Sequence, residues 1–319
     1  MTPSGCRVAD RRALIAAAFA ALAAPALAQT YPDRPVRVIV PFAPGGNVDK
    51  IARLLTPIWS ERLRQPFVVE NRAGAGGSLG AAVVAQARAD GHTLLVGSDG
   101  ALLLDPNRPG SVIDPRQVFA PIGLLSRSHS AVLVSADSPL RSVADLVALA
   151  RARPRQVSAG HPGVGTAGQT AIRQLNRAAD IELLEVPYRG GAEALSDVLG
   201  GNIDTLFTEL STVLSLALGG RGRVLAVASA SRVAALPDAP RFADAGYPSI
   251  LAGAFVGLVA PLATSPTVIE RLSAALIASV SARGMAEEYA RLAIEPPSAE
   301  QATPQGFAAF LGERLAAGP

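Results

Sequence analysis

Short apolar and β-branched runs alternate along the chain with longer Ala- and Leu-rich stretches, and glycine or proline separates them. Alternation of this kind is typical of an α/β fold with parallel, doubly wound sheets and helices on both faces. Several short runs are apolar throughout, as expected for strands covered on both faces. The pattern predicts strands over 36–40, 67–71, 93–97, 131–135, 156–159, 183–188, 205–208, 224–229 and 255–260. It predicts helices over 48–63, 79–88, 143–152, 166–178, 192–199, 266–282 and 304–315.

The chain contains no linker of disordered composition, so we expect a discontinuous division into two doubly wound lobes. Two polar or glycine-bearing segments, 127–130 and 249–253, stand where the chain would cross between them. We therefore expect lobe 1 to contain residues 29–129 and 252–319, and lobe 2 to contain residues 130–251. Domains joined by two short crossings open and close as hinged rigid bodies.

The first 28 residues have the pattern of an export signal. Three arginines precede an apolar run of 12 residues, 13–24, and Ala26-Leu27-Ala28 is a small-residue cleavage site. The run is shorter than the roughly 20 residues that span a membrane. We therefore expect cleavage after Ala28 and a mature protein in the periplasm. The pair Arg11-Arg12 leaves both the Sec and the twin-arginine export routes open.

Composition and charge narrow the function further. Cys6 is the only cysteine, so the mature chain of 291 residues (319 less 28) would contain none. Disulfides, thiolate metal sites and cysteine nucleophiles are then excluded. The signal holds three of the 29 basic and one of the 26 acidic residues. The mature chain would therefore have 26 basic and 25 acidic residues, a net charge of +1. With neither a basic patch nor interleaved aromatic residues, nucleic acid is not an expected partner.

A strand, a glycine turn and a helix start coincide where residues 36–40 run into PFAPGGNVD, residues 41–49. A helix N-terminus leaves about four backbone N–H groups unpaired and favours negative charge. Gly45 and Gly46 remove side chains that would keep a ligand from those amides, and Asn47 is a good N-cap. The junction predicts an anion-binding site, with an ordinary capped connection as the alternative.

A second junction of this form is SAGHPGVGT, residues 158–166. Gly163 and Gly165 free the backbone of this loop, and Thr166 stands at a capping position of the following helix. His161 is a candidate ligand contact in this loop. An exposed loop histidine without such a role is the alternative interpretation.

The sequence lacks the common patterns of cofactor and catalytic sites. The glycine cluster GAGGSLG, residues 74–80, fails the dinucleotide fingerprint because Leu79 stands where the third glycine belongs. Walker A, G-x-S-x-G and H-E-x-x-H patterns are absent. No two of the three histidines are at metal-ligand spacing. We therefore expect binding rather than catalysis, with no cofactor and no metal.

Two charged residues stand at predicted strand ends, where α/β proteins bind ligands. Glu209 follows the strand 205–208, and Arg189 follows Tyr188. If Glu209 faces a cleft, it would disfavour a multiply charged anion and favour a ligand with an amine. The alternative is that Glu209 is an ordinary acid in contact with solvent. The Arg189 guanidinium is suited to pairing with a ligand carboxylate. An ordinary surface arginine is the equally open alternative.

Longer motifs cover essentially all of the mature chain. They are YPDRPVRVIVPFAPGGNVD (31–49), VVENRAGAGGSLGA (68–81), ADGHTLLVGS (89–98), PGVGT (162–166), VPYRGGAEALSDVLGGNID (186–204), LAVAS (225–229) and LPDAPRFADAGYP (236–248). In these motifs and their order the chain resembles the Bug family, the TctC-like solute receptors of tripartite tricarboxylate transporters. Long motifs in a fixed order are far more specific than a short glycine pattern.

The resemblance implies a periplasmic-binding-protein (Venus flytrap) fold with a small carboxylate in the cleft. It implies that loops 42–47 and 163–166 contact the ligand largely through backbone amides and water, with Ser98 and Tyr188 nearby. It also implies delivery to a membrane permease of two subunits. The chain departs from the family pattern at Asn47, Val48, Gln169 and Glu209.

We therefore expect a monomeric periplasmic solute-binding protein for a small carboxylate. A periplasmic sensor that passes its closed state to a signalling partner is the first alternative. A secreted enzyme acting through Ser98, Tyr188 or a histidine is the second. The expected ligand-binding residues are Phe42, Ala43, Gly45, Gly46, Asn47, Ser98, His161, Gly163, Gly165, Thr166, Tyr188 and Glu209.

Overall fold

The computed structural model describes residues 31–103 and 115–316. The predicted export signal, residues 1–28, lies outside these ranges. Among the described residues, no helix combines the length and the apolar composition needed to cross a membrane.

The fold begins with three parallel strands, in which β1 (Val36–Val40) lies between β2 (Phe67–Asn71) and β3 (Thr93–Ser98). The three strands agree with the predicted ranges to within one residue. Val36, Val38, Ile39 and Val40 are fully buried, because helices cover both faces of this first sheet. β-Branched side chains suit such doubly covered strands.

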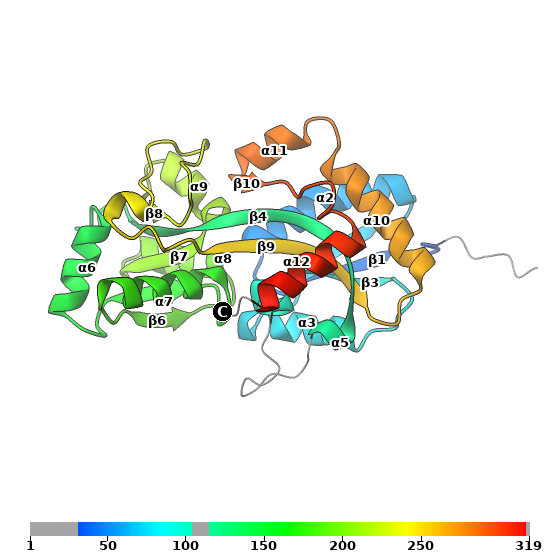
Figure 1. The fold of residues 1–319 in the computed structure, drawn as a ribbon, viewed down its shortest axis with the longest axis horizontal. Coiled ribbons are helices and arrows are strands. Elements are labelled where there is room, and N and C mark those ends of the chain that lie inside the picture. The colour runs from blue at the N-terminus through cyan, green and yellow to red at the C-terminus, as the bar shows by residue number, and fades with distance from the viewer. Residues whose placement is uncertain (1–30, 104–114, 317–319) are drawn as a thin grey trace, which may run out of the picture.

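Two long strands, β4 (Phe119–Ser135) and β9 (Gly253–Pro261), run antiparallel through the middle of the molecule (Figure 1). β9 also pairs with β3, and β4 pairs with the short β10 (Ile294–Glu295). The ladder with β9 ends at His129, and from Ser130 on β4 belongs to a second sheet.

The passage between the sheets is therefore part of a continuous strand, although its polar residues suggested a connecting segment. Ser126, Ser128 and Ser130 alternate along β4 and are all buried. A period of two is typical of a strand with one buried face. The sequence did not indicate the strand here, because the buried residues are polar serines rather than apolar residues.

The second sheet contains β7 (Thr205–Glu209), β5 (Ser158–His161) and β6 (Leu184–Pro187), with β5 parallel to both of its neighbours. β4 pairs antiparallel with β7 and with β8 (Gly222–Val227). Both sheets are thus mixed rather than wholly parallel. In the first sheet β9 and the short β10 run opposite to β1 and β3, and in the second sheet β4 runs opposite to β7 and β8.

Helices cover both faces of the first sheet. On one face pack α2 (Asn47–Leu63), α10 (Pro266–Val280) and α11 (Met285–Arg291), around a core that includes Trp59 and Tyr289. On the other face pack α3 (Ser78–Ala85) and α12 (Pro304–Ala316), which bury Phe307 against β9. The Ser265 side chain caps α10, and Pro266 occupies its first turn.

The second sheet is covered in the same way. The helices α6 (Val143–Ala152) and α7 (Ala167–Ala179) bury one face, and α8 (Gly191–Leu199) and α9 (Leu210–Leu218) bury the other. The sequence pattern did not predict α9. It follows β7 without any turn residue between them, so the apolar run gives no sign of where the strand ends.

Candidate functional site

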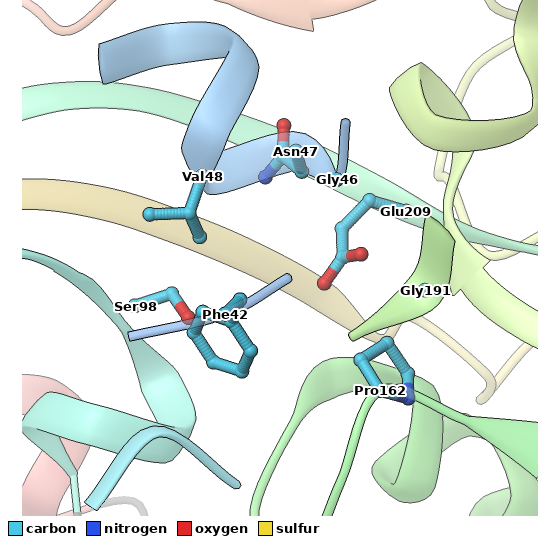
Figure 2. Close-up of a pocket in the computed structure, with 8 residues that line it drawn as sticks. All are labelled: Phe42, Gly46, Asn47, Val48, Ser98, Pro162, Gly191 and Glu209. Atoms are coloured by element: carbon cyan, nitrogen blue, oxygen red, sulfur yellow. The ribbon is translucent and has the colours of Figure 1, made fainter. Parts of the chain in front are cut away.

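A small pocket lies where the carboxyl ends of strands from both sheets meet (Figure 2). Its cavity measures about 10 Å³, room for about one water molecule. The lining residues from the half around the first sheet are Phe42, Gly46, Asn47, Val48 and Ser98, and those from the half around the second sheet are Pro162, Gly191 and Glu209. Five of these eight are among the predicted ligand-binding residues: Phe42, Gly46, Asn47, Ser98 and Glu209. Val48, Pro162 and Gly191 were not on that list, although each lies within a motif quoted above.

The loop between β1 and α2 is held by Asp49. Its carboxylate accepts hydrogen bonds from the Gly45 N–H, at 2.9 Å, and from the side chains of Arg53 and Asn71. Burial alone would raise the pKa of Asp49, but these hydrogen bonds outweigh it and the pKa is lowered. Gly45, with φ of 84°, therefore uses its N–H to shape the loop and does not line the pocket.

The N-terminus of α2 borders the pocket with unpaired backbone donors. Gly46 is the N-cap in an extended conformation and makes no side-chain cap. Among the described residues, the N–H groups of Asn47 and Val48 have no hydrogen-bond partner. Gly191, the first residue of α8, brings the N-terminus of a second helix to the same pocket. The positive ends of two helix dipoles thus point at the same pocket.

The Asn47 side chain is occupied in joining the two sheets. It is 3% exposed. Its Oδ1 accepts from the Ser211 hydroxyl at 2.8 Å, and its Nδ2 donates to the Ser128 hydroxyl at 3.3 Å. One turn later on α2, Lys50 Nζ donates to the Ser211 carbonyl oxygen at 2.5 Å. Asn47 therefore offers its backbone to the pocket, while its side chain ties α2 to α9 and β4.

The loop that follows β5 is stabilised from within. His161 is only 1% exposed, so the alternative of an exposed loop histidine is not what the structure has. Its Nδ1 lies 2.9 Å from the Gly163 carbonyl oxygen, which also accepts from the Thr166 hydroxyl. Burial lowers the pKa of His161 and favours the neutral ring. The Gly165 N–H donates to the Gln169 side chain, and the N–H groups of Gly163 and Thr166 also have partners within the loop. These three donors are therefore not free for a ligand.

The glycine-rich loops also allow the two halves of the molecule to touch. A Cβ on Gly76 would clash with the Val164 carbonyl oxygen. Gly163 lies so close that a Cβ on it would stand 2.9 Å from the Gly76 Cα. The Ala43 N–H donates to the Arg189 carbonyl oxygen at 3.2 Å. The GAGGSLG cluster thus serves close backbone contact across the molecule.

Two predicted side chains turn out to have different surroundings. The Tyr188 hydroxyl donates to Asp197 at 2.7 Å, within the second half of the molecule. Arg189 is exposed, and its N–H donates to Glu193. Ser98, in contrast, is 5% exposed and lines the pocket. Its hydroxyl has no hydrogen-bond partner among the residues described.

Glu209 ends β7 and points its carboxyl group into the pocket, between Gly46 and Asn47 on one side and Pro162 on the other (Figure 2). It is 8% exposed. Its Oε2 accepts from the Thr208 hydroxyl at 2.9 Å, and no ion pair joins it to any described residue. Burial raises the pKa of Glu209, against the opposing effect of its own N–H and of Thr208.

No group of three or more His, Cys, Asp or Glu residues within the described ranges is arranged to hold a metal ion. The pocket thus combines unpaired N–H groups, one free hydroxyl and one buried carboxylate. This set is suited to a small polar molecule, and it contains no nucleophile paired with a base.

A family model described as the tripartite tricarboxylate transporter family receptor, TctC, matches residues 51–316. Protein BugT of Bordetella pertussis is 33% identical over 94% of this chain and 92% of its own length. A UPF0065 protein from the tcbD-tcbE intergenic region of Pseudomonas sp. strain P51 is 35% identical, over 92% of this chain and 88% of its own.

Solved structures agree with this assignment. The periplasmic binding protein BugD superposes with a TM-score of 0.84 at 30% identity, over 90% of this chain and 96% of its own. MatC from Rhodopseudomonas palustris with bound malate superposes with a TM-score of 0.84 at 29% identity, over 90% of this chain and 98% of its own. An R. palustris protein with adipate also superposes with a TM-score of 0.84 at 29% identity, over 90% of this chain and 95% of its own.

These matches confirm the predicted resemblance and the two-lobed periplasmic-binding-protein fold. A family of receptors is not a class of enzymes. The chain therefore belongs to the tripartite tricarboxylate transporter receptor family, as a solute-binding receptor of the Bug and TctC type.

Proposed function

We propose that the protein captures a small carboxylate in the pocket between its two lobes, mainly through backbone N–H groups. The observation that carries this proposal is the pair of unpaired N–H groups of Asn47 and Val48 at the pocket. Backbone donors at a helix N-terminus are suited to anions because their charge is fixed and already oriented. The malate and adipate bound by the solved relatives are carboxylates of this size.

The magnitudes suffice without an arginine or lysine in the pocket. Micromolar affinity corresponds to about 8 kcal/mol. Hydrogen bonds to a charged group contribute roughly 1.5–3 kcal/mol each, and a helix dipole adds about 0.3–2 kcal/mol. Three or four such donors, from the N-termini of α2 and α8 and from Ser98, reach this range together with the contacts made when the cleft closes, after the cost of association.

Capture requires the two lobes to separate and close. The cavity has room for about one water molecule, so a ligand enters only when the contacts between the halves open. We infer a hinge where β4 and β9 pass between the sheets, with lobe 1 as residues 29–129 and 252–319. Residues 130–251 then move as lobe 2. The ladder between β4 and β9 ends at this point, between His129 and Ser130.

We further propose that the receptor acts as a monomer in the periplasm after cleavage behind Ala28, and that it delivers its ligand to a two-subunit permease. The family's name as a transporter receptor supports this role. A deletion strain that loses uptake of the ligand supports delivery. A strain that keeps uptake and loses a ligand-dependent response favours the sensor instead.

Calorimetry against mono-, di- and tricarboxylates tests the binding proposal, together with the substitution Gly46→Leu. A Cβ at Gly46 would stand 3.6 Å from the Ala43 carbonyl oxygen, so the backbone tolerates a side chain that then fills the pocket. We expect at least a 100-fold loss of affinity with an unchanged melting temperature. Gly312→Leu is the matched control, since a Cβ there meets nothing within 4 Å. Unchanged affinity in Gly46→Leu would contradict the proposed site.

A further inference from the structure

The buried carboxylate of Glu209 has no cation to balance it within the described part of the chain. The residue is 8% exposed, and its one side-chain hydrogen bond comes from the Thr208 hydroxyl. Its carboxyl group points into the pocket rather than into the core (Figure 2). The positive ends of α2 and α8 at the pocket offset part of the cost of burying this charge. Buried charged residues are in most cases also paired with an opposite charge.

No neighbouring side chain within residues 31–103 and 115–316 supplies that charge. The other seven lining residues carry no ionisable group. On α2, Lys50 points to the Ser211 carbonyl oxygen and Asp49 is paired with Arg53. Beyond Ser98, Asp99 is paired with Arg314, and beside Pro162 the neutral His161 faces Gly163.

The pocket therefore has two chemically different ends. The N-terminus of α2 and the Ser98 hydroxyl offer hydrogen-bond donors, which suit a carboxylate. The Glu209 carboxylate offers only acceptors, which suit an ammonium group. A ligand that satisfies both ends carries both groups, a short distance apart.

We propose that the ligand is a zwitterion of the amino-acid class, whose carboxylate binds at the N-terminus of α2 and whose ammonium group pairs with Glu209. This inference rests on the proposed function and adds the substrate class to it. Glu209 acts as the specificity-determining residue, because a second ligand carboxylate placed beside it meets a like charge. The ligand class then differs from the malate and adipate of the solved relatives, which carry no amine.

Matched pairs of acids test the proposal by calorimetry. Aspartate and succinate differ by one ammonium group, as do glutamate and glutarate, and short monocarboxylic amino acids and their deaminated analogues extend the series. We expect at least one aminated acid to bind tenfold or more tightly than its analogue. If an analogue without the amine binds as tightly as its partner or more tightly, this inference fails while the proposed function stands. If no acid of either kind binds, both fail.

The variant Glu209→Gln assigns the preference to this residue. The amide has the same shape and no charge, so we expect it to lose most of the tenfold preference for the aminated acid. Glu287→Gln is the matched control, since it removes an exposed acid from α11 and should leave the ratio unchanged. A ratio that survives in Glu209→Gln overturns the proposed role.

The pH dependence in the unmodified protein provides a second readout that needs no variant. Protonation of Glu209 removes the partner of the ammonium group, so the affinity for the aminated acid should fall as the pH is lowered from 8 to 5. If Glu209 is instead a neutral donor to a ligand carboxylate, the affinity for the acid without the amine should rise over this range. That second result would overturn the proposal.

Discussion

At the scale of single residues, two acids near the pocket have opposite environments. Asp49 receives three hydrogen-bond donors, and its pKa is lowered. Glu209 receives one hydroxyl, and burial raises its pKa. The first carboxylate stabilises the fold, and the second costs stability whenever it is ionised in the ligand-free protein. This difference supports the proposed functional role of Glu209.

Glu209→Gln should stabilise the ligand-free protein at neutral pH. A raised pKa means that the residue's contribution to stability is present below the usual pKa of glutamate and is lost as the pH rises through the raised value. Glutamine has no such loss, so the variant should gain about 1–3 kcal/mol at pH 8. The gain should disappear near pH 4, where both side chains are neutral. Thermal melts at the two pH values measure it.

The matched control for this prediction is Glu287→Gln, which removes an exposed acid. Its melting temperature should follow that of the unmodified protein at both pH values. Equal stability of Glu209→Gln and the unmodified protein at pH 8 would mean that the Glu209 carboxylate is already compensated.

At the scale of secondary-structure elements, local patterns predicted most of the fold. β1 and β2 were predicted to the residue, because β-branched runs between turn residues define a buried strand without reference to the rest of the chain. The first part of β4 and the whole of α9 were not. Ser126, Ser128 and Ser130 are buried by partners from two sheets, and this environment is set by tertiary contacts that no local pattern contains.

The residues of the candidate site also fall into those that local patterns indicate and those that depend on tertiary contacts. Glycine-rich loops and strand ends indicated Gly46 and Glu209, since these features are local. The pairing of Gly45 with Asp49 is also local, although the sequence does not reveal whether the glycine N–H faces the helix or a ligand. Ser211 had no signal, because its contact with Asn47 joins residues 164 positions apart.

The contact between α2 and α9, here called the clasp, joins the two halves of the molecule. Under the proposed hinge we expect it to break when the lobes open. Lys50→Met removes the hydrogen bond from Nζ to the Ser211 carbonyl oxygen while keeping the aliphatic stem. We expect a three- to tenfold loss of ligand affinity, because the closed state becomes less populated. The melting temperature of the ligand-free protein should change little. Calorimetry and thermal melts measure the two effects.

Arg62→Met is the control for this variant, because it removes one positive charge from an exposed position in the last turn of α2. Its affinity should equal that of the unmodified protein. A Lys50→Met variant that binds with full affinity would show that the clasp does not contribute to closure.

At the scale of the whole molecule, the two lobes meet through backbone at their glycine-rich loops, in addition to the side-chain contacts of Asn47 and Lys50. The Ala43 N–H contacts the Arg189 carbonyl oxygen, and Gly76 lies directly against Val164. Interfaces of this kind close without displacing bulky groups, and in the proposed site they bring the helix N-termini close to the ligand. They are also sensitive to a single methyl group, because backbone on both sides cannot move aside as a flexible side chain does.

Gly76→Ala should therefore impair closure without unfolding either lobe. The new methyl group would clash with the Val164 carbonyl oxygen, and the positive φ of 67° at this position costs about 1–2 kcal/mol in any non-glycine residue. Gly201→Ala carries the same backbone penalty at φ of 75°, but a Cβ there meets nothing within 4 Å. The difference in ligand affinity between the two variants therefore measures the effect of the contact between the lobes alone. We expect Gly76→Ala to lose at least tenfold more affinity than Gly201→Ala and to remain extended by small-angle X-ray scattering when the ligand is added. Equal affinities and equal compaction in the two variants would mean that the lobes do not need this contact to hold a ligand.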